Sequence, residues 1–183
     1  MLNIKLDCFN AVKQNLRSAK NKTPTKNYYI SWGVRQDLPQ ILEIEQSSFQ
    51  CPWTKEEFIK TLSQRTNVCL VIRKTSGTIE HDIVGYVIYE LNKKYLNIIN
   101  LAVHPHYVRF GIGSQLIDKL KRKLAIDKRR SLVAIISEYN LTGHLFFRAN
   151  GFRVEHIIPN EFCDDKGVYY DGYCARWHII RNM

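Results

Sequence analysis

Two glycines lie where a strand-like segment passes into a helical one, and this junction is the clearest sign of chemistry in the chain. Gly111 and Gly113 precede apolar residues at helical spacing, namely Ile112, Leu116, Leu120 and Leu124. Glycine lets the backbone come close to a ligand. The first turn of a helix also offers free N–H groups and the positive end of the helix dipole. The pattern predicts a loop that holds a phosphate group.

Two common phosphate-binding loops do not match this segment. A Walker A loop requires Gly-Lys-Ser/Thr, whereas Gly113 is followed by Ser114 and Gln115. A dinucleotide-binding fingerprint requires a third glycine at the position of Leu116, and the strands before it would have to be part of a strand–helix–strand unit. Neither nucleotide-binding class is therefore indicated.

Three titratable side chains after the glycine loop are candidates for proton transfer. Glu138 lies just before Asn140 and is the candidate general base. Tyr170 and Tyr173 are candidate proton donors, although strand tyrosines are more often half-buried structural residues. A bound water is a further candidate for taking the proton.

Metal and disulfide chemistry are not indicated. His104 and His106 flank Pro105 without a third ligand nearby. The five cysteines are scattered and none forms a Cys-x-x-Cys pair, so we expect neither a zinc site nor a disulfide framework. Together with the absence of a secretory signal pattern, this predicts a cytoplasmic protein.

The elements that would position the loop can be placed from periodicity and capping. Strands are expected at 28–35, 67–73, 83–91, 95–103 and 132–136, and a final strand or hairpin at 169–179. Helices are expected from Asp37 to Phe49, after the Thr54-x-x-Glu57 capping box, at 111–125 and from Asn140 to Asn150. This order predicts an α/β protein whose mixed sheet has helices on both faces.

Length, composition and charge limit the domain organisation and the partners. The 183 residues are 45% hydrophobic and 24% charged, and no apolar run is long enough for a membrane helix. We expect a basic N-terminal extension and linker at 1–27 and one domain at 28–183. The net charge of +10, concentrated in the extension and in Lys119–Arg130, indicates an anionic partner: nucleic acid, a ribonucleoprotein or a phosphate-rich cofactor. Residues 1–20 could form an amphipathic helix.

Two motifs resemble the GNAT acetyltransferase family. Its loop signature Gln/Arg-x-x-Gly-x-Gly/Ala corresponds to 108–113, with Val108 at the first position and Arg109 one residue later. Its second signature, Asn-x-x-Ala-x-x-Leu-Tyr-x-x-x-Gly-Phe, corresponds to 140–152. The segments 43–58 and 99–105 are most similar to RimI-type enzymes, which acetylate the N-terminal amine of a ribosomal protein. The resemblance covers about residues 30–180.

The resemblance implies a mixed sheet of six to seven strands and acetyl-coenzyme A as cosubstrate, with no metal. It implies that the cosubstrate contacts three groups of residues: Leu101, Ala102 and Val103; Arg109, Phe110, Gly111, Ile112, Gly113 and Ser114; and Asn140 and Phe147. The strand 101–103 would bind the acetyl carbonyl and the pantetheine arm, and the loop would bind the pyrophosphate.

The resemblance also shows where this chain departs from RimI-type enzymes. Ile135 occupies the position of their glutamate base, and Phe147 that of their tyrosine acid. A free α-amine has a pKa of about 8 and is partly neutral at pH 7, so water or Glu138 could complete its deprotonation. The sequence predicts an N-acetyltransferase acting on a protein N-terminus, with a ribosomal protein as the candidate acceptor. Two alternatives are a catalytically impaired binding module that docks on a ribonucleoprotein and a small-amine acetyltransferase.

Overall fold

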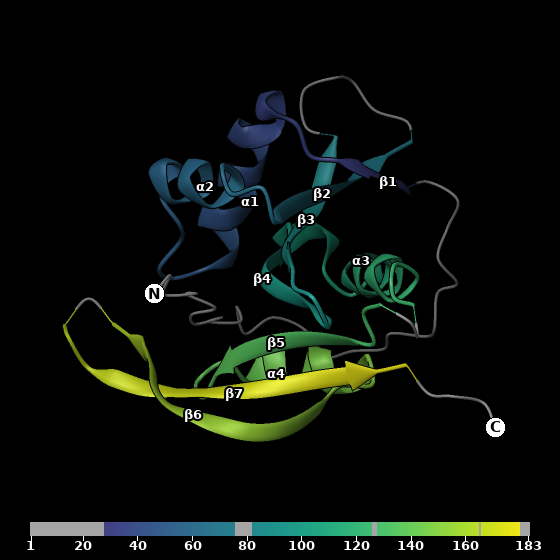
Figure 1. Cartoon of the computed structure of the whole chain (residues 1–183). Coiled ribbons are helices and arrows are strands. Elements are labelled where there is room, and N and C mark those ends of the chain that lie inside the picture. The colour runs from purple at the N-terminus through teal and green to yellow at the C-terminus, as the bar shows by residue number, and fades with distance from the viewer. Residues whose placement is uncertain (1–27, 76–81, 126–127, 165, 180–183) are drawn as a thin grey trace.

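A computed structural model describes residues 28–75, 82–125, 128–164 and 166–179 (Figure 1). The helix expected within residues 1–20 lies outside this range. The strands are β1 (Tyr28–Trp32), β2 (Asn67–Lys74), β3 (Ile83–Leu91), β4 (Tyr95–Val103), β5 (Ser131–Ser137), β6 (Arg153–Cys163) and β7 (Tyr169–His178). The helices are α1 (Leu38–Ser48), α2 (Lys55–Leu62), α3 (Ile112–Lys121) and α4 (Leu141–Ala149), with 3₁₀ turns at Arg35–Asp37 and Pro105–Tyr107.

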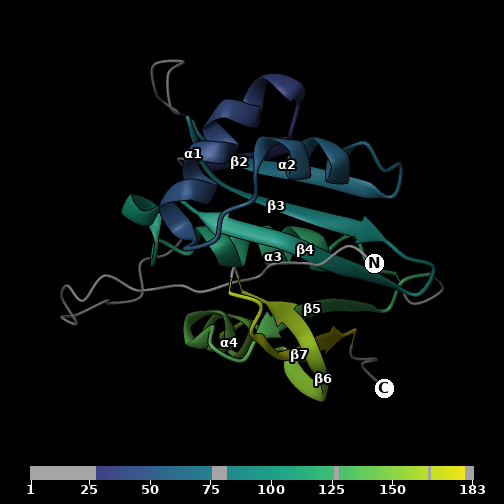
Figure 2. The same ribbon diagram turned by 90° about the vertical axis from the view of Figure 1, so that its left-hand side faces the viewer.

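The strands form one mixed sheet in the order β1-β2-β3-β4-β5-β7-β6. Neighbours are antiparallel except β4 and β5, which are parallel. The helices α1 and α2 pack on one face through a core that includes Ile44 and Phe58, and α3 and α4 pack on the other through Leu116 and Phe147 (Figure 2). The predicted α/β architecture with helices on both faces is confirmed. Among the described helices, none could span a membrane.

The caps predicted for two helices have different outcomes. The predicted capping box before α2 is present: the N–H of Glu57 donates to Thr54 Oγ1 at 3.2 Å, and the N–H of Thr54 donates to the Glu57 carboxylate at 2.7 Å. The predicted cap of α1 is wrong in its detail. The Asp37 carboxylate accepts from the N–H of Val34 and pairs with Arg73 at 2.6 Å, so it makes no capping bond to α1.

The first strand and the third helix are shorter than expected. β1 ends at Trp32 because a 3₁₀ turn follows at Arg35–Asp37, and α3 ends at Lys121 rather than near residue 125. Leu124 still packs against the core from beyond the helix, which is why the apolar periodicity extends past its end.

One strand was not predicted. β6 spans eleven residues and pairs with β7 at the edge of the sheet. Most of its side chains are exposed, and its pairing is interrupted between Ile158 and Phe162, where Pro159 lies. The segment therefore lacks the alternation of buried and exposed residues by which strands are recognised.

The sheet splits between its two parallel strands. β4 pairs with β5 over only four positions, from Tyr95 with Ser131 to Ile98 with Ala134. At that point β4 has a bulge, since Ile98 pairs with Tyr89 and Asn100 with Ile88 while Ile99 has no partner. A bulge bends its strand. Beyond it, β4 continues along β3 to Val103 and β5 continues along β7 to Ser137, so two strand edges diverge.

Candidate active site

Backbone donors line the β4 side of the split. The N–H of His104 donates to the Val84 carbonyl at 2.9 Å, which fixes the alternation of amides along this antiparallel ladder. Every second residue of β4 directs its amide the same way, so the amide of Ala102 faces β3, as that of His104 does. The amides of Leu101 and Val103 face away from β3, toward the split. Two amides of the predicted trio are thus available to a carbonyl oxygen. The side chain of Ala102 is buried under α1.

A second set of donors lies in the loop before α3. Among the described residues, none accepts a hydrogen bond from the N–H groups of residues 109–114. A helix end alone leaves four such groups unpaired. Gly111 has a φ of +76° and Arg109 a φ of +65°, backbone conformations that turn the chain sharply here. Free amides at the positive end of α3 fit the pyrophosphate of acetyl-coenzyme A.

The two glycines of this loop serve different purposes. A Cβ on Gly111 would meet nothing within 4 Å, so this exposed position is open to a ligand. A Cβ on Gly113 would lie 2.9 Å from the ring of Phe146, so Gly113 lets α3 approach α4. The side chain of Ile112 is buried in the core, Ser114 is half-buried, and Arg109 and Phe110 are exposed.

Two further residues of the predicted site hold α4 in place. The side chain of Asn140 accepts a hydrogen bond from the N–H of Gly143 at 2.7 Å, which confirms its capping role. Phe147 is 4% exposed and packs edge-to-face on Phe146 and Phe152. Its ring belongs to the core beneath the split.

The candidate base is placed at the end of β5. Glu138 is exposed, and its carboxylate accepts a hydrogen bond from the N–H of Asp171 at 3.1 Å. The two candidate donors face opposite sides of the sheet. Tyr170 stacks on Phe162, with ring centroids 5.6 Å apart, in the cluster that contains Ile135, whereas Tyr173 meets His144 of α4.

Sequence reasoning missed a buried carboxylate beside the bulge of β4. Glu45 of α1 is 1% exposed. It accepts hydrogen bonds from the N–H of Trp53 at 2.9 Å, from the amide of Asn100 at 3.2 Å and from the hydroxyl of Tyr86. Burial raises the pKa of Glu45 above its ordinary value. Its position directly after Ile44, among the buried residues of α1, is the sequence feature that could have indicated its burial.

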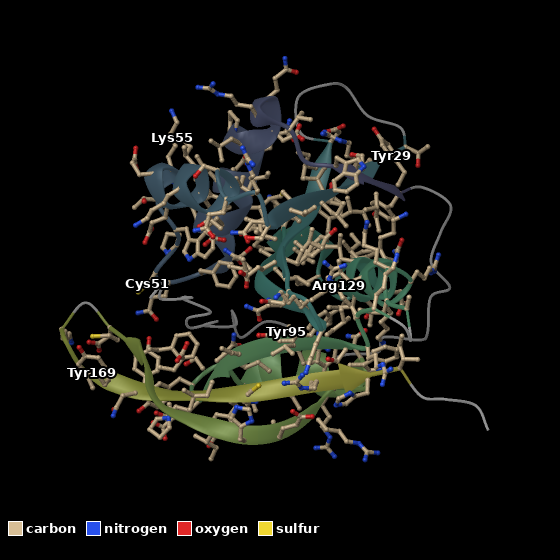
Figure 3. All side chains as sticks on the ribbon, in the orientation of Figure 1. Tyr29, Cys51, Lys55, Tyr95, Arg129 and Tyr169 are labelled. Atoms are coloured by element: carbon tan, nitrogen blue, oxygen red, sulfur yellow. The ribbon has the colours of Figure 1, made fainter. Side chains whose placement is uncertain are left out.

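An aromatic cluster, in which Phe162 and Tyr170 are buried and Tyr139 is exposed, lies beside the split on the face that α1 and α2 cover. Tyr139 lies against Tyr170, with ring centroids 5.4 Å apart, and Phe162 stacks on the other side. Figure 3 shows Cys51 of the α1–α2 loop and Tyr169 of the β6–β7 hairpin on the same side of the molecule. The loop and the hairpin therefore flank the approach to the split.

Comparisons with known proteins agree with this geometry. The family model of the acetyltransferase (GNAT) family matches residues 38–152. A putative [ribosomal protein bS18]-alanine N-acetyltransferase of Bacillus subtilis is 26% identical over 150 residues, covering 80% of this chain and 91% of the relative. The tRNA(Met) cytidine acetyltransferase TmcA of Haemophilus ducreyi is 35% identical over 80 residues, which are 42% of this chain and only 13% of that enzyme.

Solved structures show the same fold at low identity. The ribosomal-protein-S18-alanine N-acetyltransferase of Escherichia coli superimposes with a TM-score of 0.66 at 21% identity, covering 85% of this chain and 98% of that one. Arabidopsis thaliana NAA60 in complex with acetyl-CoA gives 0.71 at 17% identity, covering 83% and 99%. With the split sheet, the amide loop and the family match in agreement, the chain belongs to the acetyltransferase (GNAT) family.

Proposed function

We propose that this protein transfers the acetyl group of acetyl-coenzyme A to the N-terminal amine of a protein. The observation that carries the proposal is that two groups of backbone N–H donors follow one another along the chain. They are the Leu101 and Val103 amides at the split and the unpaired amides of residues 109–114. The names of the bacterial relatives support a ribosomal protein as acceptor. The reaction would then take place in the cytoplasm.

Each donor set has a separate task. The loop before α3 holds the pyrophosphate, and Arg109 can reach it from the exposed side of that loop. The amides of Leu101 and Val103 bind the thioester carbonyl and stabilise the negative charge that develops on its oxygen as the amine attacks. Phe110 is exposed beside the loop and offers an apolar surface to the rest of the cosubstrate.

The fraction of amine that is neutral at pH 7 favours an α-amine over a lysine as the acceptor. At pH 7 about a tenth of an amine with a pKa near 8 is neutral, against less than about 0.1% of a lysine with a pKa near 10.4. Ile135 and Phe147, the positions expected to supply a base and an acid, carry no titratable group. A site without that pair depends more heavily on an amine that is already neutral, and Glu138 or water remains available to take its proton.

One exposed ring beside the split offers a contact to a peptide. Tyr139 is 65% exposed and lies against the buried ring of Tyr170. The first side chain of a peptide can cover Tyr139, whereas a short diamine would leave it exposed to water.

Turnover of acetyl-coenzyme A with a panel of N-terminal peptides tests the proposal, with each peptide paired with its N-acetylated form. We expect free N-termini to react and blocked peptides that contain internal lysines to react at least 100-fold more slowly. Spermidine serves as the small-amine comparison. Preferential acetylation of spermidine or lysine would overturn the N-terminal assignment. Binding of acetyl-coenzyme A without acetylation of any amine would support the binding-module alternative.

A further inference from the structure

A bulge in the edge strand β6 carries a carboxylate toward the split. The β6–β7 pairing runs from Ile158 with Gly172 to Phe162 with Tyr170, so three residues of β6 face one of β7. Asn160, within this bulge, has a φ of +55°, and its N–H donates to the Asp171 carboxylate at 3.0 Å. The bulge redirects the next side chain, that of Glu161.

Gly172 makes room for that side chain on β7. A Cβ built on Gly172 would lie 2.9 Å from both Cβ and Cγ of Glu161 and 2.7 Å from Cγ2 of Ile135. Glu161 and Ile135 therefore flank the same glycine, on the face of the sheet that also carries Phe162 and Tyr170. Any larger residue at position 172 would separate them.

Ile135 places this pair of side chains at the split. It is the first residue of β5 after Ala134, the last one that pairs with β4. On β4 the Leu101 amide, which faces the split, lies three residues beyond Ile98, the partner of Ala134. The carboxylate of Glu161 is thus on the acceptor side of the position where an acetyl carbonyl would lie.

Glu161 differs from the other two carboxylates near the split. Glu45 is enclosed and its oxygens already accept several hydrogen bonds, and Glu138 is exposed and accepts from Asp171. Among the described residues, none donates a hydrogen bond to Glu161 or forms an ion pair with it. It is half-buried, and its oxygens are free to accept a proton.

The surroundings of Glu161 contain no described cation that would keep it charged. The titratable groups of β7 closest to Glu161 in the strand register are Tyr170, Asp171 and Tyr173, and Glu138 follows β5. The cations of β7, Arg176 and His178, lie toward the other end of that strand. Burial raises the pKa of Glu161 above its ordinary value, which strengthens it as a base.

We propose that Glu161 accepts the proton of the attacking amine, an inference that rests on the proposed function. The amine nitrogen forms a bond to the acetyl carbon, and the carbon–sulfur bond breaks with its electron pair on sulfur. The N–H proton passes to the Glu161 carboxylate, directly or through one water, and then through solvent to the thiolate. The products are the acetylated amine and free coenzyme A, and Glu161 returns to its starting state.

Four variants of the full chain test this assignment with an N-terminal peptide and acetyl-coenzyme A. Glu161→Gln should lower kcat about 100-fold or more while KM for the peptide and Kd for acetyl-coenzyme A change less than about threefold. Glu155→Gln, on the same strand near the far end of its pairing with β7, is the matched control and should stay within about threefold of wild type. Glu138→Gln tests the rival base. Adding Ile135→Glu to Glu161→Gln should raise kcat at least tenfold over the single variant. The new carboxylate would lie beside Gly172, opposite the side chain of residue 161.

The pH profile separates a base from a structural residue. The wild-type rate should fall at low pH as Glu161 becomes protonated, and Glu161→Gln should lose this limb and follow the amine alone. Wild-type activity in Glu161→Gln, or a large loss in Glu138→Gln instead, would overturn the proposal. If a different class of amine proves to be the acceptor, the proposed function fails. The role of Glu161 is then tested by measuring the rates of the same variants with that amine. If no amine reacts, both fail.

Discussion

At the scale of single residues, Glu45 joins four separate elements with one side chain. Its carboxylate contacts Trp53 before α2, Tyr86 of β3 and Asn100 of β4, while Glu45 itself belongs to α1. These bonds hold α1 and the segment before α2 over the bulge of β4. A charge in such a place loses hydration, so burial raises the pKa of Glu45.

This pKa makes stability depend on pH in a definite direction. Below the ordinary carboxyl pKa, Glu45 is neutral in both the folded and the unfolded chain. As pH rises, the unfolded chain loses its proton first and wild type is destabilised by up to about 1.4 kcal/mol per pH unit until the folded pKa is passed. Glu45→Gln has a constant hydrogen-bonding penalty but no such slope. Urea unfolding at several pH values between 4 and 7 should show the free energy of unfolding of the variant rising relative to wild type.

Residue-level prediction from sequence succeeds where the signal is local. The glycine loop, the Thr54 capping box and the Asn140 cap depend on neighbours within four positions, and all three were recognised. Glu161 could not be recognised in this way. Its position depends on a bulge in β6, on a glycine in β7 and on an isoleucine in β5, and no spacing in the chain brings these three together.

At the scale of elements, the packing of α3 against α4 depends on Gly113. We expect Gly113→Val to destabilise the fold by about 1–3 kcal/mol, because its Cβ would meet the Phe146 ring at 2.9 Å. Adding Phe146→Leu should recover part of that loss. Thermal unfolding of the single and double variants measures both effects.

Gly111 is the matched comparison for cosubstrate binding. Gly111→Ala places a Cβ in open space, at a local backbone cost of about 1–2 kcal/mol, and leaves the α3–α4 contact intact. It should weaken acetyl-coenzyme A binding at least tenfold in calorimetry. Unchanged affinity in this folded variant would contradict the assignment of the loop to the pyrophosphate.

Element prediction from sequence was accurate for the central strands and poor at the edge. β2 and β3 are covered on both faces along their central residues and appear as apolar runs. β6 has solvent on most of its length, and its order comes from pairing with β7. The segment is a strand because it pairs with β7, and the sequence of one segment does not reveal such tertiary pairing.

At the scale of the whole molecule, the two ends of α3 have different surroundings. The amide loop lies at its N-terminal end, whereas the basic block of the sequence begins with Lys119 and Lys121 in its last turn. The basic block is therefore one helix length from the loop that would bind the pyrophosphate. Its charge does not serve that loop directly.

We expect the domain to begin near Tyr28, as the sequence predicts. Among the residues that the structure describes, the buried hydrophobic residues of both main clusters lie between Leu38 and Ala175. We expect a chain that starts at Tyr28 to unfold within about 4 °C of the full chain, which corresponds to a contribution of less than about 1 kcal/mol from residues 1–27. A scanning calorimetry comparison would measure it. A larger drop would show that the extension packs on the domain.

The short seam between β4 and β5 has a consequence for how the molecule resists unfolding. Four residue pairs hold two half-sheets together, and the Leu101 and Val103 amides lie just beyond the last pair. A cosubstrate bound there would extend the seam and make the halves open as one cooperative unit. At 100 times Kd it adds about 2.7 kcal/mol to stability. Hydrogen exchange of the Leu101 and Val103 amides should slow when acetyl-coenzyme A is present. The bound substrate would then contribute to the stability of the sheet as well as to the reaction.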